Sequence, residues 1–306
     1  MKGVNKRLSL VVATYNRSQS LQRLLQSLLY QEYDRAAWEC VVVNNNSQDD
    51  TLDAAERFAT AHSDINMTIV TESQQGLSYA RNLGICSSHG EVIVIVDDDE
   101  VLEPQFLASY AALFSSCDVA AAGGRIIPEY EEGRPRWMNT FCESAIASPI
   151  NLGDAVRTFP GSTIPGGGNM AFRRTILAKY GLFDEKLGRT GNQLLGGEES
   201  NLFARLRGGG EKIWYCPTAT THHFIPPQRL ERQYLDKLWR GVGRSQRTRA
   251  NIEHPRSGTL RAVAAELLKW CATLAIASYL MITFRTSKAH YLFIMRSQIT
   301  RGILFG

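Results

Sequence analysis

Three consecutive carboxylates, Asp97, Asp98 and Asp99, directly follow the apolar run Val92-Ile-Val-Ile-Val96. The run has no polar alternation, so it predicts a strand that is buried on both faces, as the central strands of parallel sheets are. Adjacent carboxylates repel one another, and burial increases the repulsion. A divalent cation, Mn²⁺ or Mg²⁺, would relieve it through hard oxygen ligands and could neutralise a diphosphate leaving group. The alternative interpretation is a solvated acidic turn.

A second acidic pair, Glu198 and Glu199, follows two glycines and opens a predicted helix over 198–206. The apolar residues of this helix come three, four and seven positions after Glu199, so its carboxylate falls on the core-facing side: Leu202, Phe203 and Leu206. An acid in that position suits a general base. The alternative is that both acids only interact with the helix dipole.

Other polar groups could contact a ligand. The ends of the first two predicted strands offer amides, hydroxyls and one ring, enough to hydrogen-bond and stack a base: Thr14, Tyr15, Asn16, Asn44, Asn45, Asn46 and Ser47. Asn and Ser also form turns, so that interpretation stays open, above all for Asn44 and Asn46. Glycines at 166–168, Gly168 among them, and the following Asn169 permit close backbone approach to a ligand or form a flexible turn. Of the adjacent histidines His222 and His223, in a predicted loop over 217–229, each is more often structural or solvated than a ligand.

The elements that must position these residues follow from periodicity. Short apolar runs at 8–14, 40–43, 67–70 and 92–96 alternate with helix-period segments, and 119–122 closes the pattern. Successive β-α units predict an α/β fold with a doubly wound, mostly parallel sheet, whose ligands bind at the carboxyl ends of the strands. No GxGxxG follows the first strand, so a dinucleotide site is unsupported. Regular patterns fade over 129–165, predicted to be irregular, and return as a helix over 171–180.

The charge is unevenly distributed along the 306 residues, whose formal net charge is +4. Residues 229–306 carry 14 Lys and Arg against 4 Asp and Glu, which predicts a basic helical region that faces an anionic surface. Aromatic residues are missing from 240–261, so single-stranded nucleic acid is disfavoured and an anionic membrane surface fits better. The charge-free stretch 270–284 is 15 residues long, short of the about 20 that a span needs, so it predicts an interfacial or a packed core helix.

Six scattered cysteines without a CxxC pair, and an opening without a secretory signal, predict a cytoplasmic protein with reduced thiols. With the basic region attached to a membrane, the protein would be peripheral on the cytoplasmic face.

Together these motifs resemble the family 2 glycosyltransferases of the GT-A fold over roughly 8–245. Val12-Ala-Thr-Tyr-Asn16 resembles the opening nucleotide-binding strand, and the run VVNNNSQDDT at 42–51 resembles the "VVDNGSTDDT" type of segment. The other matches follow in family order: GLSYARNLG at 76–84 to the "GxSxARNxG" helix, 97–99 to the DxD motif, 197–199 to the "GED" motif, and 217–229 to a "PxAxVxHxxPxxR" segment with His223 at its histidine.

The resemblance implies an inverting enzyme that moves a sugar from a nucleotide sugar, UDP-sugars first, to a saccharide or lipid-linked acceptor in polysaccharide or glycoconjugate biosynthesis. Glu199 would be the base, Asp99 and His223 would hold the cation, and Asp97 would bind ribose or sugar. Arg81 would lie near the base or phosphates. The expected donor-binding set is Thr14, Tyr15, Asn16, Asn44, Asn46, Arg81, Asp97, Asp98, Gly168, Asn169 and Glu198.

Two departures stand out. Asn44 replaces the base-binding Asp of the family, and Glu199 replaces the usual Asp of the GED motif by a side chain one methylene longer. A catalytic domain over 1–228 is expected, with a nucleotide-binding half over 1–125 and an acceptor-binding half over 126–228, before the basic region 229–306. Acceptor contacts are expected in 129–165 and 187–195. The alternatives are a sugar-nucleotide pyrophosphorylase, whose glycine-rich arginine-containing loop is replaced here by Thr14-Tyr-Asn-Arg17, and a non-enzymatic anionic-surface-binding protein.

Overall fold

The computed structural model describes residues 7–116, 118–191 and 196–305, which fall into two compact units. The first unit comprises 1–128, 149–185 and 198–224, and the second comprises 129–148, 186–197 and 225–306. The second unit thus takes up the chain from 225 onward and two earlier segments, and the expected domain division at 229 remains a prediction. The expected nucleotide-binding and acceptor-binding halves remain a prediction.

The first unit is built on one mixed sheet. Its parallel part has the order β3-β2-β1-β4 and consists of β1 Leu8–Thr14, β2 Trp38–Asn44, β3 Met67–Thr71 and β4 Val92–Asp97. The sheet continues with β8 Met170–Arg173, which is antiparallel to β4, then β6 Ala121–Tyr130, β9 Ile213–Ile225 and β5 Glu100–Leu102. The two-residue β7, Arg157–Thr158, pairs with β9.

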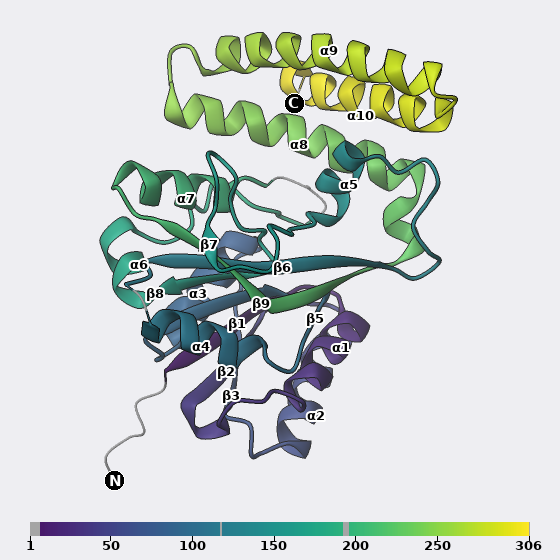
Figure 1. Ribbon diagram of the computed structural model, residues 1–306. Coiled ribbons are helices and arrows are strands. Elements are labelled where there is room, and N and C mark those ends of the chain that lie inside the picture. The colour runs from purple at the N-terminus through teal and green to yellow at the C-terminus, as the bar shows by residue number, and fades with distance from the viewer. Residues whose placement is uncertain (1–6, 117, 192–195, 306) are drawn as a thin grey trace. The chain divides into compact units, whose positions relative to one another are not determined.

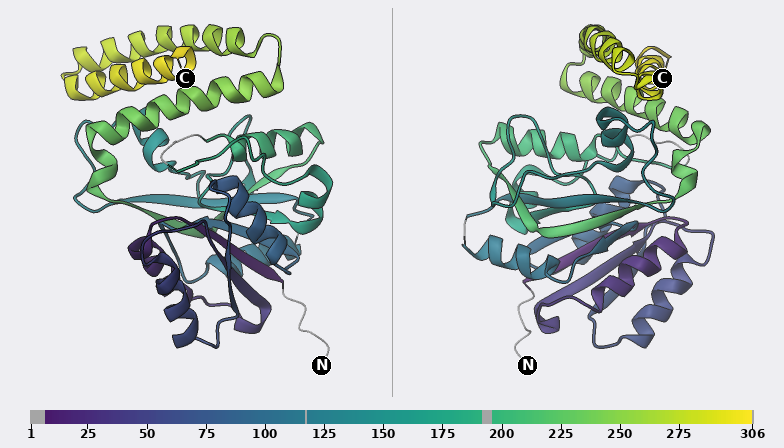
Figure 2. Two further views of the ribbon diagram at one scale, coloured as in Figure 1. Left: turned by 180° about the vertical axis from the view of Figure 1, so that it is seen from behind. Right: turned by 45° about the vertical axis from the view of Figure 1, so that its right-hand side comes forward.

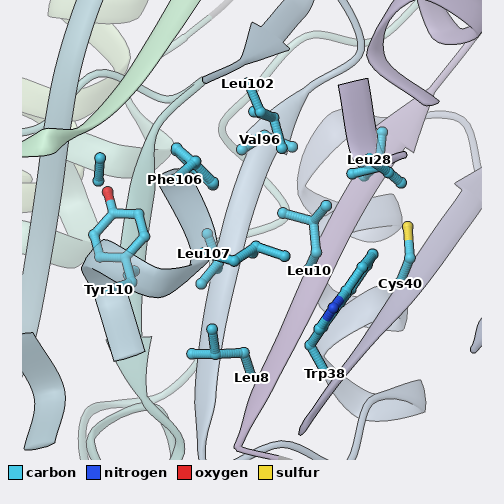
Figure 3. Packing of buried hydrophobic residues seen from close by; sticks show 14 of the residues in the cluster. Leu8, Leu10, Leu28, Trp38, Cys40, Val96, Leu102, Phe106, Leu107 and Tyr110 are labelled. Carbon is cyan, nitrogen blue, oxygen red and sulfur yellow. The ribbon is translucent and has the colours of Figure 1, made fainter. Parts of the chain in front are cut away.

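Helices cover both faces of the sheet because successive strand residues point to opposite sides. Leu8, Leu10 and Val12 of β1 pack with α1 Ser18–Leu28, α2 Thr51–Ala61 and α4 Phe106–Ser116. Figure 3 shows part of this cluster, with Leu10, Trp38 and Leu107 among the labelled residues. On the other face, Val11 belongs to the cluster that includes residues of α3 Leu77–Ser87, α6 Arg174–Tyr180 and α7 Glu198–Gly208. A short 3₁₀ turn, η1 Arg35–Ala37, precedes β2.

The second unit is helical and has a core of its own. After α5 Thr140–Ala147 and the 3₁₀ turn η2 Pro227–Leu230 come α8 Arg232–Glu253, α9 Gly258–Ile282 and α10 Thr286–Phe305. The last three helices lie side by side in every view (Figure 1, Figure 2). A Cβ atom on Gly243 of α8 would collide with the backbone of α10 at Ile299, so glycine permits this close approach.

Four expectations are corrected by these elements. Residues 170–173 form β8, so the helix predicted over 171–180 begins only at Arg174. The segment 129–165, predicted to be irregular, contains α5 and β7. Both histidines lie on β9 rather than in a loop. Residues 270–282 of the charge-free stretch belong to the 25-residue α9, which by length and composition alone could cross a membrane, so the length argument against a span is wrong.

Candidate active site

The carboxyl ends of β1, β2 and β4 meet at one edge of the sheet. Thr14 pairs with Asn44 across β1 and β2, and Ala13 pairs with Asp97 across β1 and β4. The polar residues after the three strands therefore come together, as the parallel arrangement predicts. Figure 1 shows these strands in the first unit.

The middle carboxylate of the acidic run is buried and bonded to the end of β1. The Thr14 hydroxyl donates to Asp98 Oδ2 over 2.8 Å, and Arg17 Nη1 lies 3.1 Å from Asp98 Oδ1. The same Arg17 nitrogen lies 2.5 Å from Asp99 Oδ2. Burial raises the pKa of Asp98 to about 6, although the Arg17 charge opposes this shift. Arg17 was not among the predicted site residues, and its guanidinium neutralises part of the acidic cluster.

Asp99, Glu100 and His223 form a group that could hold a cation. One ligand atom of each lies within 4.8 Å of the others. The group assembles because β5 pairs antiparallel with β9 and places Glu100 opposite His223, while His223 Nε2 lies 3.7 Å from Asp99 Oδ1. His222, the neighbour of His223, is instead 3.1 Å from Glu103.

Glu100 is the site residue that the sequence reasoning missed. It is only 2% exposed, and its Oε2 atom has no hydrogen-bond partner within the described part of the chain. Burial, together with the nearby Asp99 charge, raises the pKa of this carboxyl group to about 8, although the His223 charge opposes the shift. A cation would satisfy the orphaned oxygen, and two carboxylates with one imidazole suit Mn²⁺. The signal was present, since the acidic run Asp97-Asp-Asp-Glu100 has four members.

Arg81 joins the acidic run to the acids of α7. Its guanidinium is buried, with Nη2 2.8 Å from Asp97 Oδ1 and Nη1 3.0 Å from Glu198 Oε1 and 3.2 Å from Glu199 Oε1. Nη2 also donates to the carbonyl of Gly167. Three carboxylates and a carbonyl therefore surround Arg81, and its expected place near the base or phosphates of a donor remains a prediction.

The two acids of α7 differ in their environments. Glu198 is buried, and burial together with the nearby Glu199 charge raises its pKa to about 8, although Arg81 opposes this. Its Oε2 atom has no hydrogen-bond partner among the described residues. The side chain of Glu199 is 19% exposed and can therefore meet a ligand. Glu199 suits proton transfer with a substrate, while Glu198 suits a supporting role.

The glycine run gives these acids room. A Cβ atom on Gly167 would collide with Glu199 Oε1, and one on Gly168 would collide with Glu100 Oε1. Gly168 therefore borders the candidate cation site. The side chain of Asn169 is buried and used inside the protein: it accepts from the Tyr110 hydroxyl and donates to the carbonyls of Arg125 and Ala219. The predicted contact of Asn169 with a donor remains a prediction.

The asparagines at the strand ends form turns. Asn16 and Asn46 have positive φ angles, of 51° and 62°. Asn44 Oδ1 accepts from the amide of Ser47, and Asn16 Oδ1 accepts from the amide of Gln48. The turn interpretation therefore describes Asn16, Asn44 and Asn46 in this structure, and their contact with a donor remains a prediction. Tyr15 is partly exposed at the same edge. Of the segment 187–195, residues 192–195 lie outside the described residues.

Comparison with known proteins identifies relatives of the chain. A model of the family described as "Glycosyl transferase family 2" matches residues 9–181. The chain is 24% identical over 253 residues to the glucosyl-dolichyl phosphate glucuronosyltransferase of Haloferax volcanii, an alignment that covers 78% of this chain and 76% of the relative.

Solved structures share the fold. The mannosyltransferase PcManGT from Pyrobaculum calidifontis, in complex with GDP-Man and Mn²⁺, superposes with a TM-score of 0.58 at 22% identity, covering 96% of this chain and 86% of that one. TarS 1-349 from S. aureus, in complex with UDP-GlcNAc, gives a TM-score of 0.55 at 15% identity, covering 96% and 91%. The predicted fold class, a mostly parallel sheet with helices and a helical C-terminal region, is confirmed.

Proposed function

The chain belongs to glycosyl transferase family 2, and from this premise we propose that it is an inverting enzyme that transfers a sugar from a nucleotide diphosphate sugar to an acceptor hydroxyl. One observation carries the proposal: the buried Arg81 contacts both Asp97 of the acidic run and Glu199 of α7. A single guanidinium thereby places the candidate base beside the acids at the end of β4. The expected glycosyltransferase activity follows from the family, which leaves the pyrophosphorylase and non-enzymatic alternatives unsupported.

Glu199 acts as the base. Its carboxylate takes the proton of the acceptor hydroxyl while the hydroxyl oxygen forms a bond to the anomeric carbon of the donor. The bond from that carbon to the diphosphate breaks on the opposite face, and the electron pair leaves with the diphosphate. One displacement therefore inverts the configuration at the anomeric carbon.

The remaining residues hold the reacting groups. Asp99, Glu100 and His223 would hold a divalent cation, Mn²⁺ or Mg²⁺, which when bound stabilises the charge on the diphosphate. Arg81 positions Glu199 through an ion pair of 3.2 Å. Donor contacts are assigned to the strand-end residues and the glycine run: Thr14, Tyr15, Asn16, Asn44, Asn46, Asp97, Asp98 and Gly168.

The donor and acceptor are proposed by class. We assign the donor to the UDP-sugars, supported by the S. aureus structure that holds UDP-GlcNAc, with the GDP-sugars as the alternative suggested by the P. calidifontis structure. A saccharide or lipid-linked acceptor is supported by the H. volcanii relative, whose name specifies a dolichyl phosphate substrate. With a lipid-linked acceptor, we propose that the reaction takes place at the cytoplasmic face of a membrane, in glycoconjugate or polysaccharide biosynthesis.

A panel of nucleotide sugars tests this function. With Mn²⁺ present, one UDP-sugar should raise the melting temperature and should release UDP when incubated with the enzyme. Neither effect should occur in Asp99→Ala, because the cation loses one of its ligands. Stabilisation that is equal for all donors, or that survives chelation of the metal, contradicts the proposal.

A further inference from the structure

Helix α9 directs two buried polar residues, Glu266 and Thr273, into the second unit. Glu266 is buried against α10, where Arg296 Nη1 lies 3.1 Å from Glu266 Oε2 and the Thr300 hydroxyl donates to Glu266 Oε1 over 2.9 Å. One helical turn on, the Trp270 ring nitrogen donates to Thr300. Thr273, seven residues after Glu266, is also buried and accepts from Arg296 Nε. The inward side of α9 thus carries a buried ion pair and a hydrogen-bond network.

The outward side of the same helix is apolar. Its large hydrophobic side chains are between 48% and 77% exposed: Leu260, Leu267, Leu268, Leu274, Tyr279, Met281 and Ile282. Four of them recur every seven residues and therefore lie along one stripe: Leu260, Leu267, Leu274 and Met281. Cys271 is exposed too. We call these eight residues the outer stripe of α9.

This arrangement is the reverse of a helix in water, which buries its leucines and exposes its ions. A contiguous apolar surface of this kind marks a partner or a membrane. We propose that the outer stripe lies in the acyl region of a bilayer, with α9 parallel to the membrane surface. This inference rests on the proposed reaction at a membrane, and it names the surface of the protein that contacts the lipid.

Basic residues at the borders of the outer stripe indicate that its binding partner is an anionic lipid surface. Arg256 and Arg261 near its start and Arg285 beyond its end are all exposed. Basic side chains beside an apolar helix face reach anionic headgroups while the apolar residues enter the acyl boundary. The described residues of α9 carry one acid, Glu266, and that acid is buried.

The neighbouring helix decides between lying on the membrane and crossing it. Helix α10 packs along α9 through the Glu266–Arg296 pair and follows it after three residues, Thr283 to Arg285. If α9 crossed the bilayer, α10 would have to enter beside it with Lys288, Arg296 and Arg301. Charged residues at the bilayer centre are costly. An orientation in the membrane plane keeps α10 outside the acyl region while the outer stripe is buried.

Flotation with phosphatidylcholine–phosphatidylglycerol vesicles tests the contact in the full-length protein. The wild type should float with the vesicles. The variant Leu267→Gln/Leu274→Gln should have a partition coefficient lower by about a hundredfold, because it lacks the favourable free energy of transferring two leucine side chains from water into the acyl region. Both leucines are exposed, so the variant should keep the wild-type melting temperature. Tyr30→Gln, which removes a side chain 70% exposed on the first unit, should bind like the wild type.

The membrane contact would be overturned if the wild type and the double variant partitioned equally into the vesicles, or if the wild type stayed in the soluble fraction. The membrane contact would also be overturned if the wild type did not bind vesicles but formed a stable dimer in lipid-free buffer, and if the double substitution dissociated that dimer. The outer stripe would then contact a second copy of the chain. Sugar transfer by the double variant to a water-soluble acceptor reports separately on the proposed function, because it needs no membrane.

Depth measurements test the orientation. Cys86, Cys117 and Cys271 are first replaced by serine. A single cysteine is then introduced at 260, 267, 274 or 281 and labelled with an environment-sensitive fluorophore. The depth of each label is read from its quenching in vesicles that contain lipids with nitroxides at graded depths. An in-plane helix predicts the same shallow depth at all four positions. Deep labels at 267 and 274 with shallow ones at 260 and 281 would show a crossing helix and overturn the in-plane orientation.

Discussion

At the scale of single residues, the candidate site contains two buried acids, Glu100 and Glu198, whose surroundings differ. Glu100 is placed against Asp99 and His223, where a cation satisfies its orphaned oxygen. Glu198 is placed against Arg81 and Glu199, where proton uptake satisfies it. Both acids are hidden from solvent, yet only the first has an imidazole beside it. The two therefore call for different tests.

The cation site is tested with matched variants. Glu100→Gln should weaken Mn²⁺ binding at least about tenfold, measured by titration calorimetry without donor, because a neutral amide replaces one carboxylate ligand. Glu103→Gln, three positions along, should bind Mn²⁺ like the wild type. The adjacent histidines form a second pair, in which His223→Gln should lose affinity and His222→Gln should keep it. If all four variants matched the wild type, the group would not be the cation site.

The protonation of Glu198 has a consequence for stability. Its folded pKa of about 8 lies above the ordinary value of 4.5, so the stability it contributes is present below pH 4.5 and is lost as the pH rises through 8. Glu198→Gln should remove this loss. Thermal unfolding should give the variant a melting temperature about 5 °C above the wild type at pH 9, with the difference vanishing near pH 4.5. A constant difference across this range would contradict the assignment.

At the scale of elements, the end of β4 and the start of α7 come together because Gly167 and Gly168 between them lack side chains. Gly167→Ala should displace Glu199, since the new Cβ would also lie 3.1 Å from Arg81 Nη2. We expect kcat to fall about tenfold or more with little change in donor affinity, measured in steady-state transfer assays. Gly208→Ala at the end of α7 meets nothing within 4 Å and is the control. Equal kcat for the two variants would leave the close packing without catalytic importance.

The elements also show what the sequence could predict. The parallel strands were predictable because each contains a short apolar run between helix-period segments, and the meeting of their polar ends follows from topology. Strand β8 was missed because its four residues merge into the helix that follows. The histidines on β9 were taken for loop residues because prolines bracket the segment, and only the pairing of Glu100 with His223 shows their place. That pairing spans more than a hundred residues, beyond the reach of local periodicity.

At the scale of the whole molecule, the chain combines a sheet unit and a helical unit that have separate cores. Residues 129–148 are distant in sequence from the last three helices but belong to the same unit, since Met138 and Cys142 pack in the cluster with Leu292. The charge-free stretch considered in the sequence starts at 270 because Lys269 precedes it, although α9 begins at Gly258. Glu266 breaks the apolar pattern in the sequence, while its partner Arg296 comes thirty residues later.

One measurement tests the central claim, that Glu199 is the base of an inverting transfer. The substitution Glu199→Gln keeps the shape of the side chain and removes the proton acceptor. With saturating nucleotide sugar and Mn²⁺, the first-turnover rate of the variant should fall by roughly 10²–10⁴ while the dissociation constant of the donor stays near the wild-type value. The wild-type product should carry the anomeric configuration opposite to the donor, read by NMR. A variant that transfers at the wild-type rate but binds the donor weakly, or a product that retains the donor configuration, would contradict the account.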